Sequence, residues 1–222
     1  MRKRKIIFGE YDTAAHGWTL TGWQLTAAEQ KTNFVDKPAG DGSWDLSTAL
    51  TGGVARYSDR SLTATFECSE GDRTTRELTI RRMINTLDGM RVDITLPDDD
   101  THFISGRLHV AREYNDLAHA AVTVTAVCSP WKHAKAETFL PLTLTAEKQK
   151  IILTKDGRRT VVPDIKVTGG PMFIEYDGEI TEVPGDGETY QWSALVLTSG
   201  AHRVTVSGAG TALISYREAV LE

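Results

Sequence analysis

Polar and apolar residues alternate one by one along most of this chain, and this pattern constrains the fold more than any other feature. Such alternation is typical of strands with one buried face, because successive side chains point to opposite faces of a sheet. Near the C-terminus, for example, Val204 and Val206 fall on one face while Arg203 falls on the other. Turn signals rich in glycine, aspartate and proline separate these segments. We therefore predict a mainly β protein, with strands in 61–68, 89–96, 104–114, 118–129, 163–169, 171–178, 193–200 and 202–208.

One segment follows a helical period instead. In "TTRELTIRRMINTLDG", four apolar residues recur at helical spacing, and Gly89 stands just beyond them as a C-terminal stop. The pattern predicts a single amphipathic helix over about 74–88 that lies across a sheet. Three arginines are expected on its outer, solvent-facing side: Arg76, Arg81 and Arg82.

The composition changes after Ser129, where the regular alternation is lost and short strands with frequent glycine follow. We place a domain boundary at about residue 138. The resulting parts, 1–138 and 139–222, are both within the range of independently folding domains.

The overall charge argues against some classes of function. The 222 residues carry a formal net charge of -5, and 40% of them are hydrophobic. An acidic chain is poorly suited to gripping nucleic acid through its phosphates. The basic start "MRKRK" is followed by Glu10 and Asp12, where a secretion signal requires an apolar run, so we expect no such signal. No segment has the length and apolarity expected of a membrane span.

The two cysteines, Cys68 and Cys128, both fall in predicted strands. In a chain without a secretion signal, two thiols are more often buried and reduced than joined in a disulfide. We expect both to be small core residues.

Catalytic and metal-binding motifs are lacking. The best metal candidate is the run from Asp98 to Asp100 with His102 nearby, but adjacent residues in a turn rarely converge on one cation, so we expect a solvated turn. The sequence has no nucleophile elbow, phosphate loop or zinc-protease motif. A glycosidase would need two carboxylates about 5–10 Å apart, which a sequence cannot show. We predict no enzyme activity, no metal and no cofactor.

Two aromatic residues raise a different possibility. Tyr190 and Trp192 lie two positions apart, so on a strand they share a face. Such a pair could form a platform on which a sugar ring stacks, although both could equally belong to a core.

The most unusual stretch is "VDKPAGDGSWDLSTALTGG", which runs from 35 to 53. It is too rich in glycine, proline and aspartate for a regular strand or helix, and too patterned for a flexible tether. Together with the later Tyr57 and Arg60, this stretch resembles the distal tail protein (Dit) family of long-tailed bacteriophages that infect Gram-positive hosts. The resemblance rests on Val35, Asp36, Pro38, Asp41, Gly42, Asp45, Leu46, Ser47, Tyr57 and Arg60, and on the closing "SYRE". Ala39 departs from the pattern, since glycine is common there.

The resemblance covers essentially the whole chain and implies two domains. The N-terminal domain would be a β-sandwich with one helix that assembles into a six-membered ring. The C-terminal domain would be a β-sandwich like those of galectins and carbohydrate-binding modules. In the family this ring joins the tail tube to the baseplate hub, a Tal-like protein, and the genome passes through its channel. The resemblance thus implies a virion protein, made in the host cytoplasm, that contacts DNA without binding it specifically.

The residues themselves are compatible with assembly. A closed ring repeats one contact between two different surfaces of each subunit. Pro38 fixes one backbone dihedral, and tryptophan is enriched among interface hot spots. We expect the loop to be a ring-interface element with Trp44 as an anchor. The alternative is an adhesion module of the baseplate that binds host glycan through Tyr190 and Trp192.

Overall fold

The computed structural model describes residues 4–221 and divides the chain into two compact units. Within the described residues, the first unit comprises residues 4–132 and Leu221, and the second comprises His133–Val220. The division therefore falls inside a long strand, β9 (Ala120–Ala134), whereas the boundary predicted from the sequence lies at about residue 138. We propose that each of these two units is a domain that folds independently.

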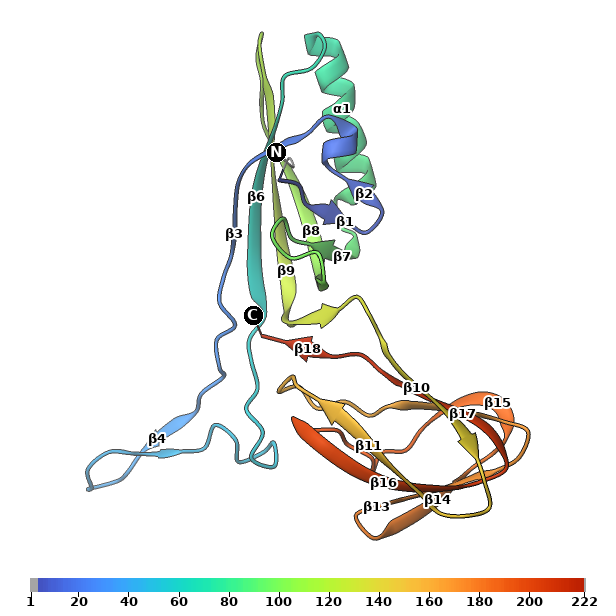
Figure 1. Ribbon diagram of the computed structural model, residues 1–222. Coiled ribbons are helices and arrows are strands. Elements are labelled where there is room, and N and C mark those ends of the chain that lie inside the picture. Colours follow the sequence, from blue (N-terminus) through green and yellow to red (C-terminus); the bar gives the residue numbers. More distant parts are fainter. Residues whose placement is uncertain (1–3, 222) are drawn as a thin grey trace. The chain divides into compact units, whose positions relative to one another are not determined.

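The first unit is built on one antiparallel sheet (Figure 1). Its strands follow the order β2-β1-β7-β8-β9-β6-β3. Their bounds are β1 (Ile7–Phe8), β2 (Tyr11–Asp12), β3 (Thr19–Leu25), β6 (Arg60–Cys68), β7 (Arg91–Thr95), β8 (His102–Asn115) and β9. A short 3-10 turn, Ala14–His16, links β2 to β3.

The predicted alternation is clearest in β6, the strand between β9 and β3. Every second residue from Arg60 to Cys68 is buried, so that Leu62, Ala64 and Phe66 point into the core while Ser61 and Thr63 point outward. Phe66 also meets Phe8 of β1 edge-to-face, with their ring centroids 6.1 Å apart. The period of two thus places one face of the sheet against the core.

The single helix α1 spans Arg73–Leu87, close to the predicted range, and covers that face beside β8 (Figure 1). Asp72 caps its N-terminus by accepting a hydrogen bond from the amide of Thr75 at 2.7 Å. Ile80, Met83 and Leu87 are buried against the sheet. After the helix, Gly89 adopts a left-handed φ of 74°, which terminates the helix as the sequence predicts.

The prediction that Arg76 faces solvent is wrong. Its side chain is only 3% exposed, and its guanidinium donates hydrogen bonds to the carbonyls of Gly71, Asp116 and Leu117 at 2.6, 3.0 and 3.0 Å. Arg76 therefore ties the first turn of α1 to the turn between β8 and β9. Arg81 is exposed as predicted and pairs with Glu77.

Both cysteines are buried and unpaired, as predicted. Burial raises the pKa of the Cys128 thiol to about 11, so this group stays protonated.

The second unit consists of two four-stranded antiparallel sheets with a shared apolar core. One sheet has the order β10-β17-β12-β15 and the other β11-β16-β13-β14. Leu153, Val167, Ile174 and Ile214 are among the fully buried residues of that core. The strand bounds are β10 (Thr138–Leu144), β11 (Gln149–Lys155), β12 (Asp164–Thr168), β13 (Met172–Tyr176), β14 (Glu179–Val183), β15 (Asp186–Gln191), β16 (Gly200–Gly208) and β17 (Gly210–Tyr216). A short last strand, β18 (Ala219–Val220), follows.

The structure corrects one predicted strand. Residues 193–200 do not form a strand before Gly200, although Leu195 and Leu197 alternate and are both fully buried. Instead the amide of Leu195 bonds back to the carbonyl of Trp192, and Val161 and Leu197 form an isolated bridge. Alternate burial therefore arises here from a loop that packs its leucines into the core.

Candidate functional site

The segment between β3 and β6 forms an arm, which we define as residues 26–59. The composition of 35–53 predicts no regular strand or helix there, but the arm contains a short hairpin of β4 (Phe34–Asp36) and β5 (Ser43–Asp45). In Figure 1 the arm leaves the sheet where β3 ends and β6 begins. Backbone hydrogen bonds between its two sides, such as Lys31 to Arg56 at 2.8 Å and Leu46 to Asn33 at 2.8 Å, hold it as an extended ribbon.

The turn at the tip of the hairpin follows from its sequence. Gly42 has φ 76° and Ala39 has φ 57°, so both adopt the left-handed conformation. A non-glycine residue in this conformation costs of order 1–3 kcal/mol, which explains why glycine suits the position of Ala39. The turn residues Pro38 and Asp41 are exposed.

Polar side chains reinforce this hairpin. Asp36 accepts a hydrogen bond from the hydroxyl of Ser43 at 2.9 Å. Asp45 accepts one from the amide of Ser47 at 2.9 Å, and hydrogen bonds from Ser47 lower the pKa of the Asp45 carboxyl. These two predicted residues therefore act locally, by shaping the arm.

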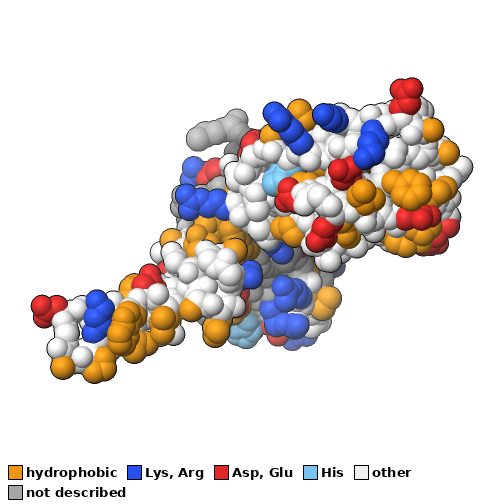
Figure 2. All heavy atoms as spheres, turned by 90° about the horizontal axis from the view of Figure 1, so that it is seen from below, with side chains coloured by type: hydrophobic (Ala, Val, Ile, Leu, Met, Phe, Trp, Pro, Cys, Tyr) orange, Lys and Arg blue, Asp and Glu red, His pale blue; other side chains and the backbone are white. Residues whose placement is uncertain are grey.

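The apolar side chains of the arm are exposed to an unusual degree. Trp44 lies opposite Val35 in the ladder, and the two side chains are 50% and 42% exposed. Figure 2 shows hydrophobic side chains gathered along the arm, at its lower left. We call this set the apolar strip: Phe34, Val35, Trp44, Leu46, Leu50 and Val54.

An isolated two-stranded hairpin is marginally stable in water, and soluble monomers rarely leave apolar side chains together on their surface. Burying a fully exposed side chain such as Leu50 would contribute about 1.5–3 kcal/mol, and burying a half-exposed one would contribute about half of that. The arrangement is suited to packing against another protein surface.

Two further predicted residues lie away from the apolar strip. Arg60 is 4% exposed and donates from Nε to the carbonyl of Thr26 at 2.6 Å, which fixes the base of the arm. Tyr57 lies edge-to-face with Trp131 of β9, at a centroid distance of 5.4 Å, and bridges to Gln30. Both therefore anchor the arm to the sheet and do not extend its exposed surface.

The two residues of the predicted sugar platform, Tyr190 and Trp192, pack against the core of the second unit. Tyr190 pairs directly with Ile165, which is fully buried, so its ring lies on the core side of β15. Trp192 follows the end of that strand and is also packed against the core. The hydroxyl of Tyr190 donates to Asp186.

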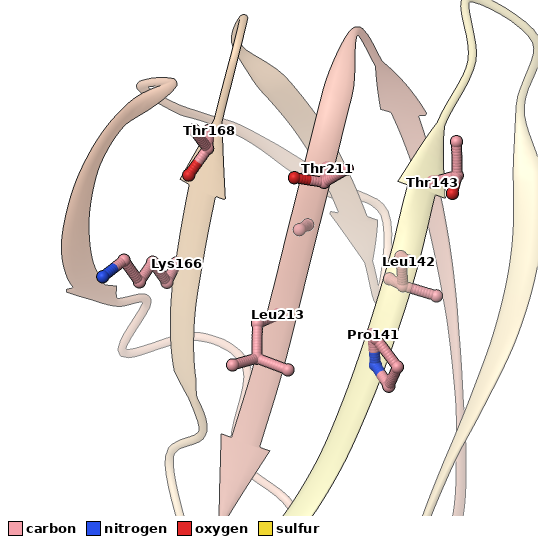
Figure 3. Close-up of a pocket in the computed structure, with 8 residues that line it drawn as sticks. Pro141, Leu142, Thr143, Lys166, Thr168, Thr211 and Leu213 are labelled. Carbon is pink, nitrogen blue, oxygen red and sulfur yellow. The ribbon is translucent and has the colours of Figure 1, made fainter.

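A shallow hollow of about 490 Å³ lies on the opposite, outer face of this sheet (Figure 3). Thr143, Thr211 and Thr168 form one row across three strands, and Lys166 lies beside Leu213. The lining has no aromatic side chain: it consists of Pro141, Leu142, Thr143, Lys166, Thr168, Thr211, Ala212 and Leu213. Neither Tyr190 nor Trp192 belongs to it.

The acidic run forms a compact turn between β7 and β8. Asp99 accepts hydrogen bonds from the amides of Thr101 and His102 at 3.2 and 3.1 Å, and His102 Nδ1 lies 3.1 Å from the same carboxylate oxygen. Burial favours the protonated carboxyl, but hydrogen bonds from His102 and from the hydroxyl of Thr101 outweigh it and hold the pKa of Asp99 at about 2. Within residues 4–221 no group of three or more His, Cys, Asp or Glu side chains is placed to hold a metal ion. The helix of the described chain is too short and polar to cross a membrane.

Comparisons with known proteins identify the fold alone. No family model matches the chain, and no curated protein matches it. Among solved structures, the chain is similar to the crystal structure of the SPP1 Dit (gp 19.1) protein, described as a paradigm of the hub adsorption apparatus in Gram-positive infecting phages. The TM-score is 0.69 at 12% sequence identity, and the match covers 97% of this chain and 98% of the SPP1 protein. From end to end, therefore, this chain has a Dit-like fold.

Proposed function

We propose that this protein is a structural component of a bacteriophage tail that assembles into a six-membered ring at the distal end of the tail. In this role the ring joins the tail tube to a Tal-like baseplate hub, and the genome passes through its central channel. The single observation that carries the proposal is the arm, because it presents an apolar strip on a chain whose fold matches SPP1 Dit along its whole length.

A closed ring imposes a geometric requirement on each of its subunits. Each subunit of a ring must present one surface to the neighbour on one side and a different surface to the other neighbour. An extended arm anchored by Arg60 and Tyr57 can reach a neighbouring subunit without unfolding its own domain. Because its hairpin is already formed, little conformational entropy is lost on docking.

The charge of the chain is also compatible with a conduit. A formal net charge of -5 disfavours tight binding of phosphate groups, which would hold a duplex that has to slide. We propose a protein of the virion, without enzymatic activity, whose partners are further copies of itself and the adjoining tube and hub proteins.

Light scattering and negative-stain electron microscopy of the purified full chain test the proposal. We expect a mass of six copies and annular particles at high protein concentration. A variant in which residues 31–56 are replaced by a short Gly-Ser turn should remain a folded monomer. A wild-type chain that stays monomeric at every concentration, alone and with a tube protein, would refute the ring.

Host-glycan binding by the second unit is the alternative. Its predicted platform residues, Tyr190 and Trp192, pack against the core, so no specific observation favours this function.

A further inference from the structure

We propose that the free edge of β3 pairs with an extended segment of a second copy of this chain, so that the subunit contact includes a main-chain β-ladder. This inference rests on the proposed ring and deepens it, because it assigns a second contact element besides the arm.

The outer edge of β3 has no partner strand within the described chain. β3 pairs with β6 on one side, and no strand lies on its other side in the sheet order. The amide of Thr26 bonds to the carbonyl of Ser61 at 2.9 Å, which sets the alternation of backbone groups along this ladder. In an antiparallel pair these groups point alternately toward and away from the partner. The N–H and C=O groups of Leu25 and Trp23 therefore point away from β6.

Along Gly22–Leu25, β3 lacks charge, proline and irregular pairing, which are the usual protection of an edge against strand addition. Proteins protect edge strands by keeping them short or by placing charge, proline or a bulge on them. β2 has two residues, β10 carries Pro141 and β14 carries Glu179 and Glu182. β11 carries the exposed Lys150, with the exposed Lys148 just before it, and β15 has a register shift beside Asp186.

By contrast, the seven residues of β3, "TLTGWQL", include neither a charge nor a proline. Its one irregularity is the register shift between Leu20 and Gly22, which leaves Gly22–Leu25 in regular pairing with β6. This regular stretch is long enough to offer outward-pointing backbone groups at two positions, Trp23 and Leu25.

The side chains of β3 also favour coverage by another segment. Leu20, Trp23 and Leu25 pack against the core but remain only partly buried. A strand added at this edge would bury apolar surface and satisfy backbone groups at the same time.

The occupant that we assign is a second copy, because the edge is continuous with the arm. β3 ends at Leu25 and the arm starts at Thr26 (Figure 1). A neighbouring subunit whose contact extends from the apolar strip to the base of the arm would lie next to the last residues of β3. One subunit could thus bury both features with a single extended surface.

Amide hydrogen exchange at single-residue resolution tests this inference. At a concentration at which the Trp44→Ala variant is monomeric, its amides of Trp23 and Leu25 should exchange fast, while Thr26 is protected by its bond to Ser61. In the assembled wild type, exchange at Trp23 and Leu25 should slow by about tenfold or more. Assembly with unchanged exchange at both amides would overturn the β-ladder but leave the ring intact. Failure of the wild type to assemble would overturn both.

A matched pair of variants provides the second test. Leu25→Pro removes an N–H that points away from β6, whereas Leu25→Ala removes the same side chain and keeps that N–H. We expect the two variants to unfold at similar temperatures, and we expect the alanine variant alone to assemble. Normal assembly of a folded Leu25→Pro protein would refute the inference. If Leu25→Pro unfolds at a much lower temperature than Leu25→Ala, its failure to assemble would follow from unfolding. In that case the exchange rates of Trp23 and Leu25 decide whether the β-ladder forms.

Discussion

Trp44 lies directly across the β4–β5 hairpin from Val35, and the two side chains share one exposed face of the arm. Cross-strand aromatic and β-branched pairs stabilise a hairpin by only about 0.2–1 kcal/mol, so this contact alone does not explain a half-exposed tryptophan. We propose that its main role is in contact with another molecule.

Trp44→Ala should therefore leave the folded monomer nearly unchanged and weaken its assembly. We expect the free energy of unfolding to change by less than about 1 kcal/mol, because the side chain is half exposed. Truncation of an interface hot spot costs about 2 kcal/mol or more, which shifts the midpoint concentration of assembly by at least about thirtyfold. Sedimentation velocity across a concentration series would measure the shift.

Leu117→Ala is the matched control for that experiment. Leu117 is 92% exposed, but it lies in the turn between β8 and β9, away from the apolar strip. We expect no change in assembly. Equal effects of the two substitutions would argue against a specific role for the arm.

Replacing Arg76 should destabilise the first unit strongly. Arg76→Leu leaves three carbonyl groups without the guanidinium that now bonds to them, at Gly71, Asp116 and Leu117. We expect a loss of about 2–4 kcal/mol in the free energy of unfolding, measured by urea denaturation. Arg81→Ala is the control, since its exposed pair with Glu77 contributes less than about 0.5 kcal/mol. A neutral Arg76→Leu would show that the buried hydrogen bonds are dispensable.

Gly106→Ala should destabilise the sheet by overpacking. A Cβ at Gly106 would lie 2.7 Å from Cys128 Sγ and 3.2 Å from the end of Ile94. Overpacking of this kind costs about 1–3 kcal/mol, detectable as a lower midpoint in thermal unfolding. The double variant Gly106→Ala/Cys128→Ala should recover part of the loss, because the clashing sulfur is gone. Additive effects of the two substitutions would contradict this explanation.

The turn between β7 and β8 should lose stability in acid through Asp99. The pKa of its carboxyl is about 2 in the folded protein, below the ordinary value of 3.8, so the ionised form stabilises the fold. This contribution is fully present above about pH 4, is lost as the pH falls through about 2, and amounts to about 2 kcal/mol. We expect Asp99→Asn to be less stable than the wild type near pH 7 and equally stable near pH 2. Urea denaturation at several pH values would reveal the converging curves; a constant difference would exclude the ionised carboxylate as the cause.

Trp192→Ala tests whether this residue serves the core or a sugar. Because Trp192 packs against the second core, we expect its truncation to lower the free energy of unfolding by about 2 kcal/mol or more. Phe139→Ala, at a side chain that is 57% exposed, should cost less than about 1 kcal/mol. If Trp192→Ala instead leaves stability unchanged and abolishes binding of the full chain on a glycan array, the adhesion role replaces the one proposed here.

The sequence by itself determined the class of fold, the position of the helix and the burial of both cysteines. These features depend on local periodicity: alternation in β6 and helical spacing in α1 specify which face of each element is apolar. It also identified the stretch 35–53 as unusual, and with it the resemblance to the Dit family.

Only the tertiary structure decided where charged and aromatic side chains lie. Arg76 and Arg60 have polar sequence contexts, yet both are buried because carbonyl groups from distant parts of the chain surround their guanidinium groups. Tyr190 and Trp192 could have faced either side of a sheet, and the pairing of Tyr190 with the buried Ile165 settled the side. A period of two distinguishes the two faces of a strand but does not identify what covers them, because that depends on contacts between residues far apart in the sequence.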